Sequence, residues 1–318
     1  MTAVLDIGVD VAKAELVIAV CGRPDLSTAI PNTERAVKEW IGTVPIGSRI
    51  GAESTGPYHE LLALAGEKAG MNVFVLNARD VFYYARALGQ RGKTDRTDAE
   101  VIARYIAEHH GHLHTFEAGT HAQRRIDSLL RRRAAVAGQK SALKQTLRGV
   151  PELSEEVAVL QKQYDVLLAA LDQQLLSLVQ EDTATSVTFS LLKTIPGFGP
   201  QNAAMFASVL KRIPFKNSDA LVAFSGLDPR PADSGQRRGR RRLSKRGPSL
   251  MRRLIYLAAS ASSRTKAGRP IYAALRARGF STTAALVILS RKLLRTAFAV
   301  CKSGKPFDIE QFSTANVC

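Results

Sequence analysis

The sequence is poor in cysteine and has no long apolar run. Its three cysteines, Cys21, Cys301 and Cys318, are odd in number, far apart and never in a Cys-x-x-Cys pair, which argues against a disulfide framework or a cysteine-based zinc site. No apolar segment approaches the roughly 18 to 20 residues of a membrane-spanning helix, and Asp6 interrupts the N-terminus where a signal peptide would be apolar. We therefore expect a cytoplasmic protein, associated with the bacterial nucleoid.

Zinc ligands of the ordinary kind are also lacking around the histidines. Five of the six histidines gather in one short stretch without a cysteine or carboxylate at zinc-ligand spacing; they are His109, His110, His112, His114 and His121. We interpret this stretch as a solvated loop between domains.

Acidic residues are scarce compared with basic ones. The 28 acidic residues face 45 lysines and arginines, which gives a formal net charge of +17 and favours a polyanionic partner, nucleic acid first. The 318 residues, 45% of them hydrophobic, suffice for real cores in two or three domains.

Strand and helix patterns alternate over residues 1–118. Apolar runs in Ala3 to Val20, interrupted at Asp10 to Glu15, predict two adjacent strands, and the later runs predict strands at Ser48–Glu53 and Asn72–Leu76. Helical patterns occupy Thr33–Ile41, Tyr58–Ala69, Ala78–Leu88 and Thr97–Glu108. This alternation predicts an α/β domain with a mixed sheet.

Residues 119–185 lack β-branched runs and show coiled-coil spacing. A seam at steps of three and four predicts one helix, through Val157, Leu160, Tyr164, Leu167, Leu171, Leu175 and Leu178. A helix before it turns at Gly149 to Pro151, so an antiparallel hairpin or a subunit contact would bury the seams. Its outer face carries cations that favour phosphate contacts, namely Arg124, Arg125, Arg131, Arg132, Arg133, Lys140, Lys144 and Arg148.

Four carboxylates stand where they could converge. Asp10 and Glu53 each stand at the end of a predicted strand, and Asp95 and Asp98 are three apart at a helix start, so their Cβ atoms lie about 5 to 6 Å apart on one face. Such a cluster requires hard divalent cations to offset its repulsion. Two magnesium ions about 3.5 to 4 Å apart would serve phosphoryl transfer.

Ordinary roles remain open for each acid. Asp95 and Asp98 could cap a helix, and Glu53 could precede a turn. Asp6 is a rival to Asp10, because Asp-x-Gly on a first strand also occurs in actin-like sugar kinases. That fold would need glycine-rich phosphate loops, which the sequence does not contain.

Residues 186–318 are predicted to be mainly helical and strongly basic. The string Ile195-Pro196-Gly197-Phe198-Gly199-Pro200 predicts a helix-hairpin-helix, in which Gly197 and Gly199 let backbone amides meet a phosphate; a plain turn is the alternative. A charge run follows in a predicted loop, with Arg237, Arg238, Arg240, Arg241, Arg242, Lys245 and Arg246. The tail after Phe307 is expected to be poorly ordered.

Seven strings in order carry a family resemblance. They resemble the DEDD transposases of the insertion sequence one-ten family, related to Piv-type invertases, over nearly the whole chain: Gly8 to Lys13, Ala52 to Gly56, Lys93 to Ala99, Ile195 to Gly199, Gly226 to Pro229, Ser234-Gly235 and Ser244 to Gly247. One departure is Ser54, where alanine is common. The resemblance implies an RNase H-like (RuvC-like) domain, a coiled coil and a C-terminal transposase domain, and it selects Asp10 over Asp6.

The same resemblance implies the partners and the outcome. Donor and target DNA would be recombined under the guidance of a structured bridge RNA, by a homo-oligomer, a dimer assembling to a tetramer. The charge is compatible with this, since a protein that leaves sequence reading to base pairing needs mainly shape and backbone contacts. The alternatives are a RuvC-like structure-specific endonuclease without a covalent intermediate, and a non-catalytic DNA-binding protein with an acidic patch.

Three serines of the basic segment could be the nucleophile of such a recombinase. Ser244 and Ser249 flank Gly247-Pro248 ahead of an apolar helix, where a hydroxyl most often caps. Ser234 precedes no helix signal and stands before Gly235, close in sequence to Arg237 and Arg238. It also falls on the family's Ser-Gly position, so we predict Ser234 as the nucleophile.

Overall fold

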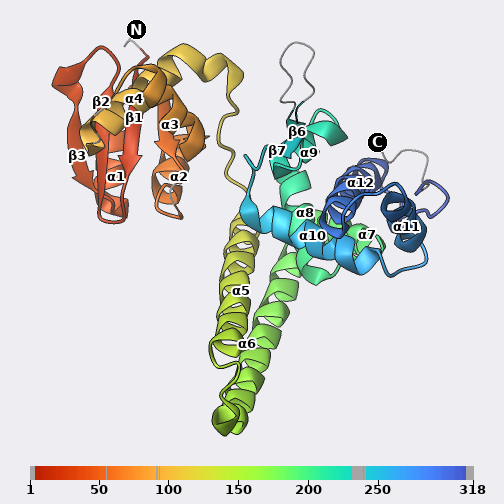
Figure 1. The fold of residues 1–318 in the computed structure, drawn as a ribbon. Helices are drawn as coiled ribbons and strands as arrows, with labels where there is room; N and C mark the ends of the chain where they lie inside the picture. The colour runs from red at the N-terminus through yellow and green to blue at the C-terminus, as the bar shows by residue number, and fades with distance from the viewer. Residues whose placement is uncertain are drawn as a thin grey trace. The chain divides into compact units, whose positions relative to one another are not determined.

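The computed structural model describes residues 4–54, 56–90, 92, 94–230, 239 and 241–312. Two compact units make up the chain, residues 1–118 and 119–318. The first combines a sheet with helices, and the second is almost entirely helical (Figure 1).

The first unit is built on a five-stranded mixed sheet in the order β3-β2-β1-β4-β5. Its strands are β1 (Asp6–Val11), β2 (Glu15–Val20), β3 (Thr28–Pro31), β4 (Arg49–Glu53) and β5 (Asn72–Leu76). β1, β2 and β3 pair antiparallel, whereas β1, β4 and β5 are parallel. This arrangement is consistent with the predicted RNase H-like fold. The strand β3 was not predicted, because its four residues are mostly exposed and end in proline.

Four α-helices accompany this sheet in the described residues. They are α1 (Glu34–Ile41), α2 (Glu60–Lys68), α3 (Ala78–Ala87) and α4 (Asp95–His109), with 3-10 turns η1 (Pro24–Leu26) and η2 (His110–His112). The four helices form within a few residues of the predicted ranges. Apolar strand residues such as Ile7, Val9 and Ile50 are fully buried and form a core with α1 and α2. A second core lies between the sheet and the helices α3 and α4, with Phe74 and Ile102.

Three of the five clustered histidines are not in the solvated loop that the sequence predicted. His121 is the first residue of helix α5 (His121–Thr146), and His109 and His110 pack at the end of α4. The ring of His109 lies 4.8 Å from the ring of Tyr105, between centroids, and 5.5 Å from that of Tyr84. The ring of His110 contacts the Arg49 guanidinium, with Nε2 2.7 Å from a terminal nitrogen. The loop interpretation is therefore wrong for these three histidines, because His121 is helical and the end of α4 packs against neighbouring aromatic and basic side chains.

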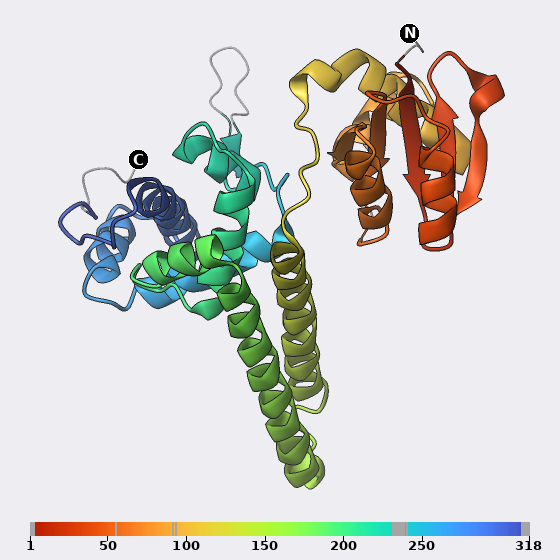
Figure 2. The same cartoon turned by 180° about the vertical axis from the view of Figure 1, so that it is seen from behind.

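The second unit begins with a long helical hairpin. Helices α5 (His121–Thr146) and α6 (Ser154–Glu181) run antiparallel along each other, joined by a turn with η3 (Pro151–Leu153) (Figures 1 and 2). Only part of the predicted seam is buried in the chain: Leu175 and Leu178 lie in the core with the C-terminal helices, whereas Leu160 and Leu167 are 48% and 47% exposed.

The remaining helices pack around one apolar core. They are α7 (Thr183–Leu192), α8 (Pro200–Arg212), α9 (Ser218–Ser225), α10 (Ser249–Ser262), α11 (Gly268–Ala277) and α12 (Thr282–Ser303). A short hairpin of β6 (Pro229–Arg230) and β7 (Arg242–Leu243) stands between α9 and α10. Phe206, Ile255 and Leu293 are fully buried where α8, α10 and α12 meet. Within the described residues, no helix has both the length and the apolar content to cross a membrane.

The described part of the tail after Phe307, residues 308–312, packs against the helices, so the prediction of a poorly ordered tail is wrong for these residues. The rest of that predicted tail lies outside the described residues. Phe312 is only 5% exposed, its ring lies 5.4 Å from the ring of Phe307, and the Lys292 ammonium lies 5.1 Å from its centroid. Phe307 and Phe312 therefore anchor this segment, and Phe312 does so against the middle of α12.

Candidate active site and nucleic-acid interface

Asp10 and Glu53 are neighbours at the carboxyl ends of two parallel strands. The register of β1 and β4 pairs Asp6 with Arg49 and continues to Val9 and Ala52, so one residue further on Asp10 stands beside Glu53. Side chains alternate along a strand. Asp10 and Glu53 therefore share the sheet face of Gly8 and Gly51.

Helix α4 covers that face and brings its first turn to the same edge. A Cβ at Gly8 would lie 2.1 Å from the Ala99 carbonyl oxygen and 2.2 Å from the Ala103 nitrogen, so only glycine lets the α4 backbone rest on β1. At its far end α4 reaches His110, which contacts Arg49 at the start of β4. Since α4 thus runs from the carboxyl edge to the amino edge, its first turn, with Asp98, starts beside Asp10 and Glu53.

The helix start is capped by threonines and not by the aspartates. The Thr94 hydroxyl accepts from the Thr97 nitrogen at 3.2 Å, and the Thr97 hydroxyl accepts from the Thr94 nitrogen at 3.0 Å. Asp95 is exposed and Asp98 half-buried in the first turn, where the positive end of the helix favours carboxylates. The capping alternative for these two acids is therefore excluded.

Carboxylate oxygens of this kind are suited to a hard divalent cation. The predicted ligands at this edge are Asp10, Glu53 and Asp98, with Asp95 three residues earlier on the helix. Within the part of the chain that the structure describes, no three His, Cys, Asp or Glu side chains are close enough together to hold a metal ion. The residues thus fit a metal by chemical type and by shared edge, although their side chains do not converge on a single point.

A second constellation lies in the C-terminal unit, where two separate strings of sequence meet. A Cβ at Gly226 would lie 2.7 Å from the Gly247 nitrogen, and one at Gly247 would lie 1.9 Å from the Phe224 carbonyl oxygen. The Lys245 nitrogen donates to the Gly226 carbonyl at 3.0 Å. These contacts, with the β6–β7 pairing, close the base of the segment 231–241.

Ser244 and Ser249 do not cap a helix, which corrects their predicted role. Ser244 is 2% exposed; its hydroxyl donates to a carboxylate oxygen of Asp228, and its nitrogen to the Asp228 carbonyl at 3.0 Å. Ser249 is the first residue of α10, whose N-cap is Pro248 and which has no side-chain cap. Ser244 instead links the residue after β7 to Asp228, the residue before β6, through two hydrogen bonds.

One arginine of this base was missed by the sequence analysis. Arg252 on α10 donates to the carbonyls of Ser225 and Gly247, and its half-burial lowers the pKa of its guanidinium. It thereby joins the end of α9 to the start of α10. Its position six residues after the last cation of the basic run, at the start of the apolar helix, was the available signal.

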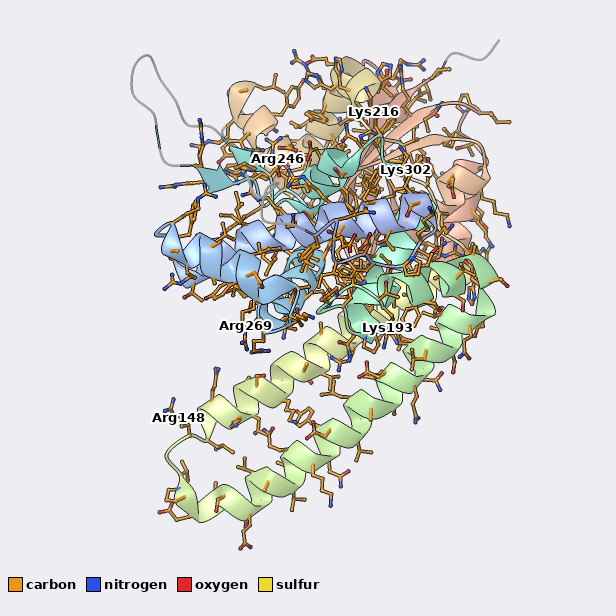
Figure 3. All side chains as sticks on the ribbon, turned by 90° about the vertical axis from the view of Figure 1, so that its right-hand side faces the viewer. Arg148, Lys193, Lys216, Arg246, Arg269 and Lys302 are labelled. Carbon is orange, nitrogen blue, oxygen red and sulfur yellow. The ribbon has the colours of Figure 1, made fainter. Side chains whose placement is uncertain are left out.

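The predicted nucleophile lies outside the described residues. The same holds for Arg237, Arg238 and Arg240, which precede β7. The cations that follow them are exposed: Arg241, Arg242, Lys245 and Arg246, the last labelled in Figure 3. Lys245 adopts the left-handed conformation, with φ of 53°, where its nitrogen can reach Gly226.

The glycines ahead of α8 have different structural reasons. Gly197 has φ of 92°, and a Cβ there would lie 2.3 Å from the Ala258 carbonyl oxygen of α10, so close packing requires it. Gly199 is the N-cap of α8 and nothing crowds it. Gly199 is thus the glycine whose surroundings suit an approaching phosphate, and both remain predictions as nucleic-acid contacts.

The cations on and just after α5 differ in their exposure and in the contacts they make. Arg133 forms a bidentate pair with Asp172 of α6, at 2.6 and 2.8 Å, and Lys140 pairs with Asp165 of α6. Arg124 donates to the Gly119 carbonyl. Arg125, Arg131 and Arg132 are exposed, as are Lys144 and Arg148 near the hairpin tip.

Comparison with known proteins covers both units. A family model for DEDD transposases matches residues 7–152, and a model for transposases of the IS116/IS110/IS902 family matches residues 189–273. The chain is 26% identical over 268 residues to a pilin gene-inverting protein of Moraxella lacunata, and 25% to that of Moraxella bovis, covering 80% of each chain. An uncharacterized 44.8 kDa protein of insertion element IS116 from Streptomyces clavuligerus is 26% identical, over 60% of this chain and 45% of its own length. The chain therefore belongs to the DEDD transposases of the IS116/IS110/IS902 family, enzymes of DNA transposition and recombination.

Proposed function

We propose that this transposase cuts and rejoins DNA with two cooperating groups: a divalent-metal site of Asp10, Glu53, Asp95 and Asp98, and a nucleophilic Ser234. A structured bridge RNA selects the donor and target DNA. The observation that carries the proposal is the meeting of Asp10, Glu53 and the start of α4 at one sheet edge.

The carboxylates of this edge would hold two magnesium ions. Bound there, magnesium lowers the barrier to phosphoryl transfer by stabilising charge on the attacking and leaving oxygens. The protein's own contribution is position: the β1–β4 register fixes Asp10 and Glu53, and the Thr94–Thr97 cap fixes the turn that carries Asp95 and Asp98.

Ser234 supplies the covalent step of the proposal. Its hydroxyl oxygen forms an ester bond to the scissile phosphorus while the bond from phosphorus to the leaving DNA oxygen breaks. The hydroxyl proton passes to a carboxylate or water, and the leaving oxygen takes up a proton to become a free DNA hydroxyl. The phosphoserine link keeps the bond energy for rejoining to a new DNA end. Arg237 and Arg238, three and four residues on, would hold the phosphate.

Nucleic-acid binding in this proposal is dominated by phosphate contacts. The exposed cations Arg125, Arg131 and Arg132 on α5 and Arg241 to Arg246 after the serine support it, together with the net charge of +17. Such contacts recognise the nucleic-acid backbone and the shape of the duplex. An RNA-guided enzyme needs mainly these contacts, because base pairing with the RNA reads the sequence.

A second copy of the chain would cover the outer side of α6. Val159, Leu160, Val166 and Leu167 are each exposed by 47% or more and recur at intervals of seven residues, the spacing of a helix that packs against another helix. We propose that this face joins subunits into a dimer that assembles further on DNA.

The test is recombination of a donor and a target plasmid by the full chain with its RNA. Alanine at Asp10, Glu53 or Asp98 should abolish joining while RNA binding stays within about twofold. Cleavage that persists in the Ser234→Ala variant, with free ends and no protein–DNA link, would favour a water-using endonuclease over this proposal.

A further inference from the structure

A cavity of about 640 Å³ lies between the last turns of α12 and the segment that follows it. This volume is in the range of small-ligand sites. It lies in the C-terminal unit and involves none of the residues assigned above to catalysis or nucleic-acid binding.

The floor of the cavity contains a buried cation. Lys292 is 8% exposed and lies over the Phe312 ring at 5.1 Å; no carboxylate of the described residues forms an ion pair with it. A buried charge without a counterion is costly. Burial and the nearby Arg295 lower the pKa of Lys292, and a bound anion would offset both effects.

Charges at the rim leave the cavity positive. Arg295 donates to Asp219 at 3.0 Å. Asp308 accepts from the Glu310 nitrogen and the Gln311 amide, and its charge offsets that of Lys305 across the cavity lining. The lining thus contains three cations, Lys292, Arg295 and Lys305, and one carboxylate, Asp308. Since Arg295 is paired with Asp219 outside the lining, the surplus positive charge is that of Lys292.

The other part of the lining is apolar. Val300, Pro306, Phe307 and Phe312 belong to it, and the exposed Ser303 adds a hydroxyl to the lining. An apolar, aromatic wall beside a buried cation matches a ligand with a flat heterocycle joined to a phosphate.

We propose that this cavity binds a single nucleotide, with its base against Val300 and Phe307 and its phosphate at Lys292 and Lys305. The nucleotide could be free or could be one unit of a strand turned out of its stack. Both sources present the same chemistry to the cavity.

Site-resolved photolabelling of the full chain tests this. One arm uses 8-azidoadenosine 5′-monophosphate, and the other a trinucleotide with the same base at its centre; labelled peptides are mapped by mass spectrometry. Labelling within residues 299–312 is expected in at least one arm, and the arm that labels identifies the source. Labelling that is absent there in both arms overturns the proposal.

Variants separate binding from structure. Lys292→Met removes the charge but keeps an apolar chain of similar length, so folding should be retained while labelling falls at least tenfold; Lys305→Gln should reduce it severalfold. Lys302→Met is the matched control, because Lys302 lies on the same helix outside this cavity (Figure 3). Unchanged labelling in a folded Lys292→Met variant would show that Lys292 serves only to anchor Phe312. Equal competition by inorganic phosphate and by adenosine monophosphate would show that no base is bound. Either result contradicts the proposal.

Discussion

Arg49 holds Asp6 in a two-point ion pair at the amino ends of β1 and β4. The guanidinium Nε lies 2.5 Å from one carboxylate oxygen, and a terminal nitrogen donates to the other at 2.8 Å. The pair is half-buried, with side chains 24% and 16% exposed. Asp6 therefore stands at the opposite end of β1 from Asp10 and is committed to a structural contact, which removes it as a rival for the proposed metal site.

Substitution of Asp6 and of Asp10 should have opposite consequences. Asp6→Asn should lower the free energy of unfolding by about 1 to 3 kcal/mol, between the values for exposed and buried pairs, and should leave recombination by the folded protein nearly unchanged. Asp10→Asn should abolish recombination with little loss of stability. Denaturant unfolding and a plasmid recombination assay distinguish the two, and loss of joining in a well-folded Asp6→Asn would place Asp6 in the site.

The start of α4 allows the cap to be tested separately from the acids. Thr94→Ala removes the cap and should cost about 1 kcal/mol of stability, with activity retained at permissive temperature. Asp98→Ala leaves the cap intact and should abolish recombination and any stabilisation by magnesium. Thermal melting with and without magnesium provides the measurement. An active Asp98→Ala variant would refute the four-carboxylate site.

Local patterns predicted most elements but not which distant residues meet. Valine and isoleucine runs correctly indicated four strands, whereas β3 has too few residues and too little burial to leave a pattern. The spacing of leucines indicated α6, yet it cannot tell Leu178, buried in the chain, from Leu167, which is exposed. That difference depends on where α7 and α8 pack.

The part of the candidate metal site that lies at the ends of strands could be predicted from the sequence. Asp10 and Glu53 follow from the parallel pairing of two recognised strands. The link from Ser244 to Asp228 and the burial of Lys292 are long-range contacts, and nothing in their neighbouring residues encodes them. The serine-rich segment ahead of an apolar helix therefore suggested a cap at Ser244, where the structure has a hydrogen bond across the base of the hairpin.

Two neighbouring arginines of α5 should differ in function: Arg132 should contribute to nucleic-acid affinity, and Arg133 to the stability of the hairpin. Arg132 is exposed, so Arg132→Gln should weaken nucleic-acid binding and reduce the slope of log affinity against log salt by up to about one. Arg133→Gln should mainly destabilise the hairpin, because it leaves Asp172 without its cation. Binding titrations at several salt concentrations, with melting curves for both variants, check this. Equal salt slopes for Arg132→Gln and the unmodified protein would exclude a phosphate contact there.

Acid should loosen the hairpin through the same pair. Burial raises the pKa of Asp172, but the hydrogen bonds from Arg133 and Gln201 and the Arg133 charge outweigh it, so the pKa lies below its ordinary value of 3.8. Because the folded pKa is the lower one, the stabilisation is complete well above pH 3.8 and is lost as pH falls through the folded value. Helix content followed by circular dichroism should show Asp172→Asn losing less stability between pH 5 and pH 2 than the unmodified chain, within the roughly pH 5 to 1 window typical of paired carboxylates. Equal losses would contradict the role of the pair.

Ser234 and Ser244, two of the three serines of the basic segment, offer the sharpest test of the chemistry. Ser234→Ala should eliminate any covalent protein–DNA product, because it removes the hydroxyl proposed to form the ester bond with the scissile phosphorus. Ser244→Ala removes a buried hydrogen bond to Asp228, so it should lower stability by about 1 to 3 kcal/mol and still form the covalent product at reduced temperature. The reaction is stopped with denaturant, the DNA digested, and the peptide that retains a nucleotide mapped by mass spectrometry. A DNA-linked peptide that persists in Ser234→Ala would move the nucleophile to another residue, whereas loss of the link in a stably folded Ser244→Ala would give the Ser244–Asp228 pair a part in the reaction itself.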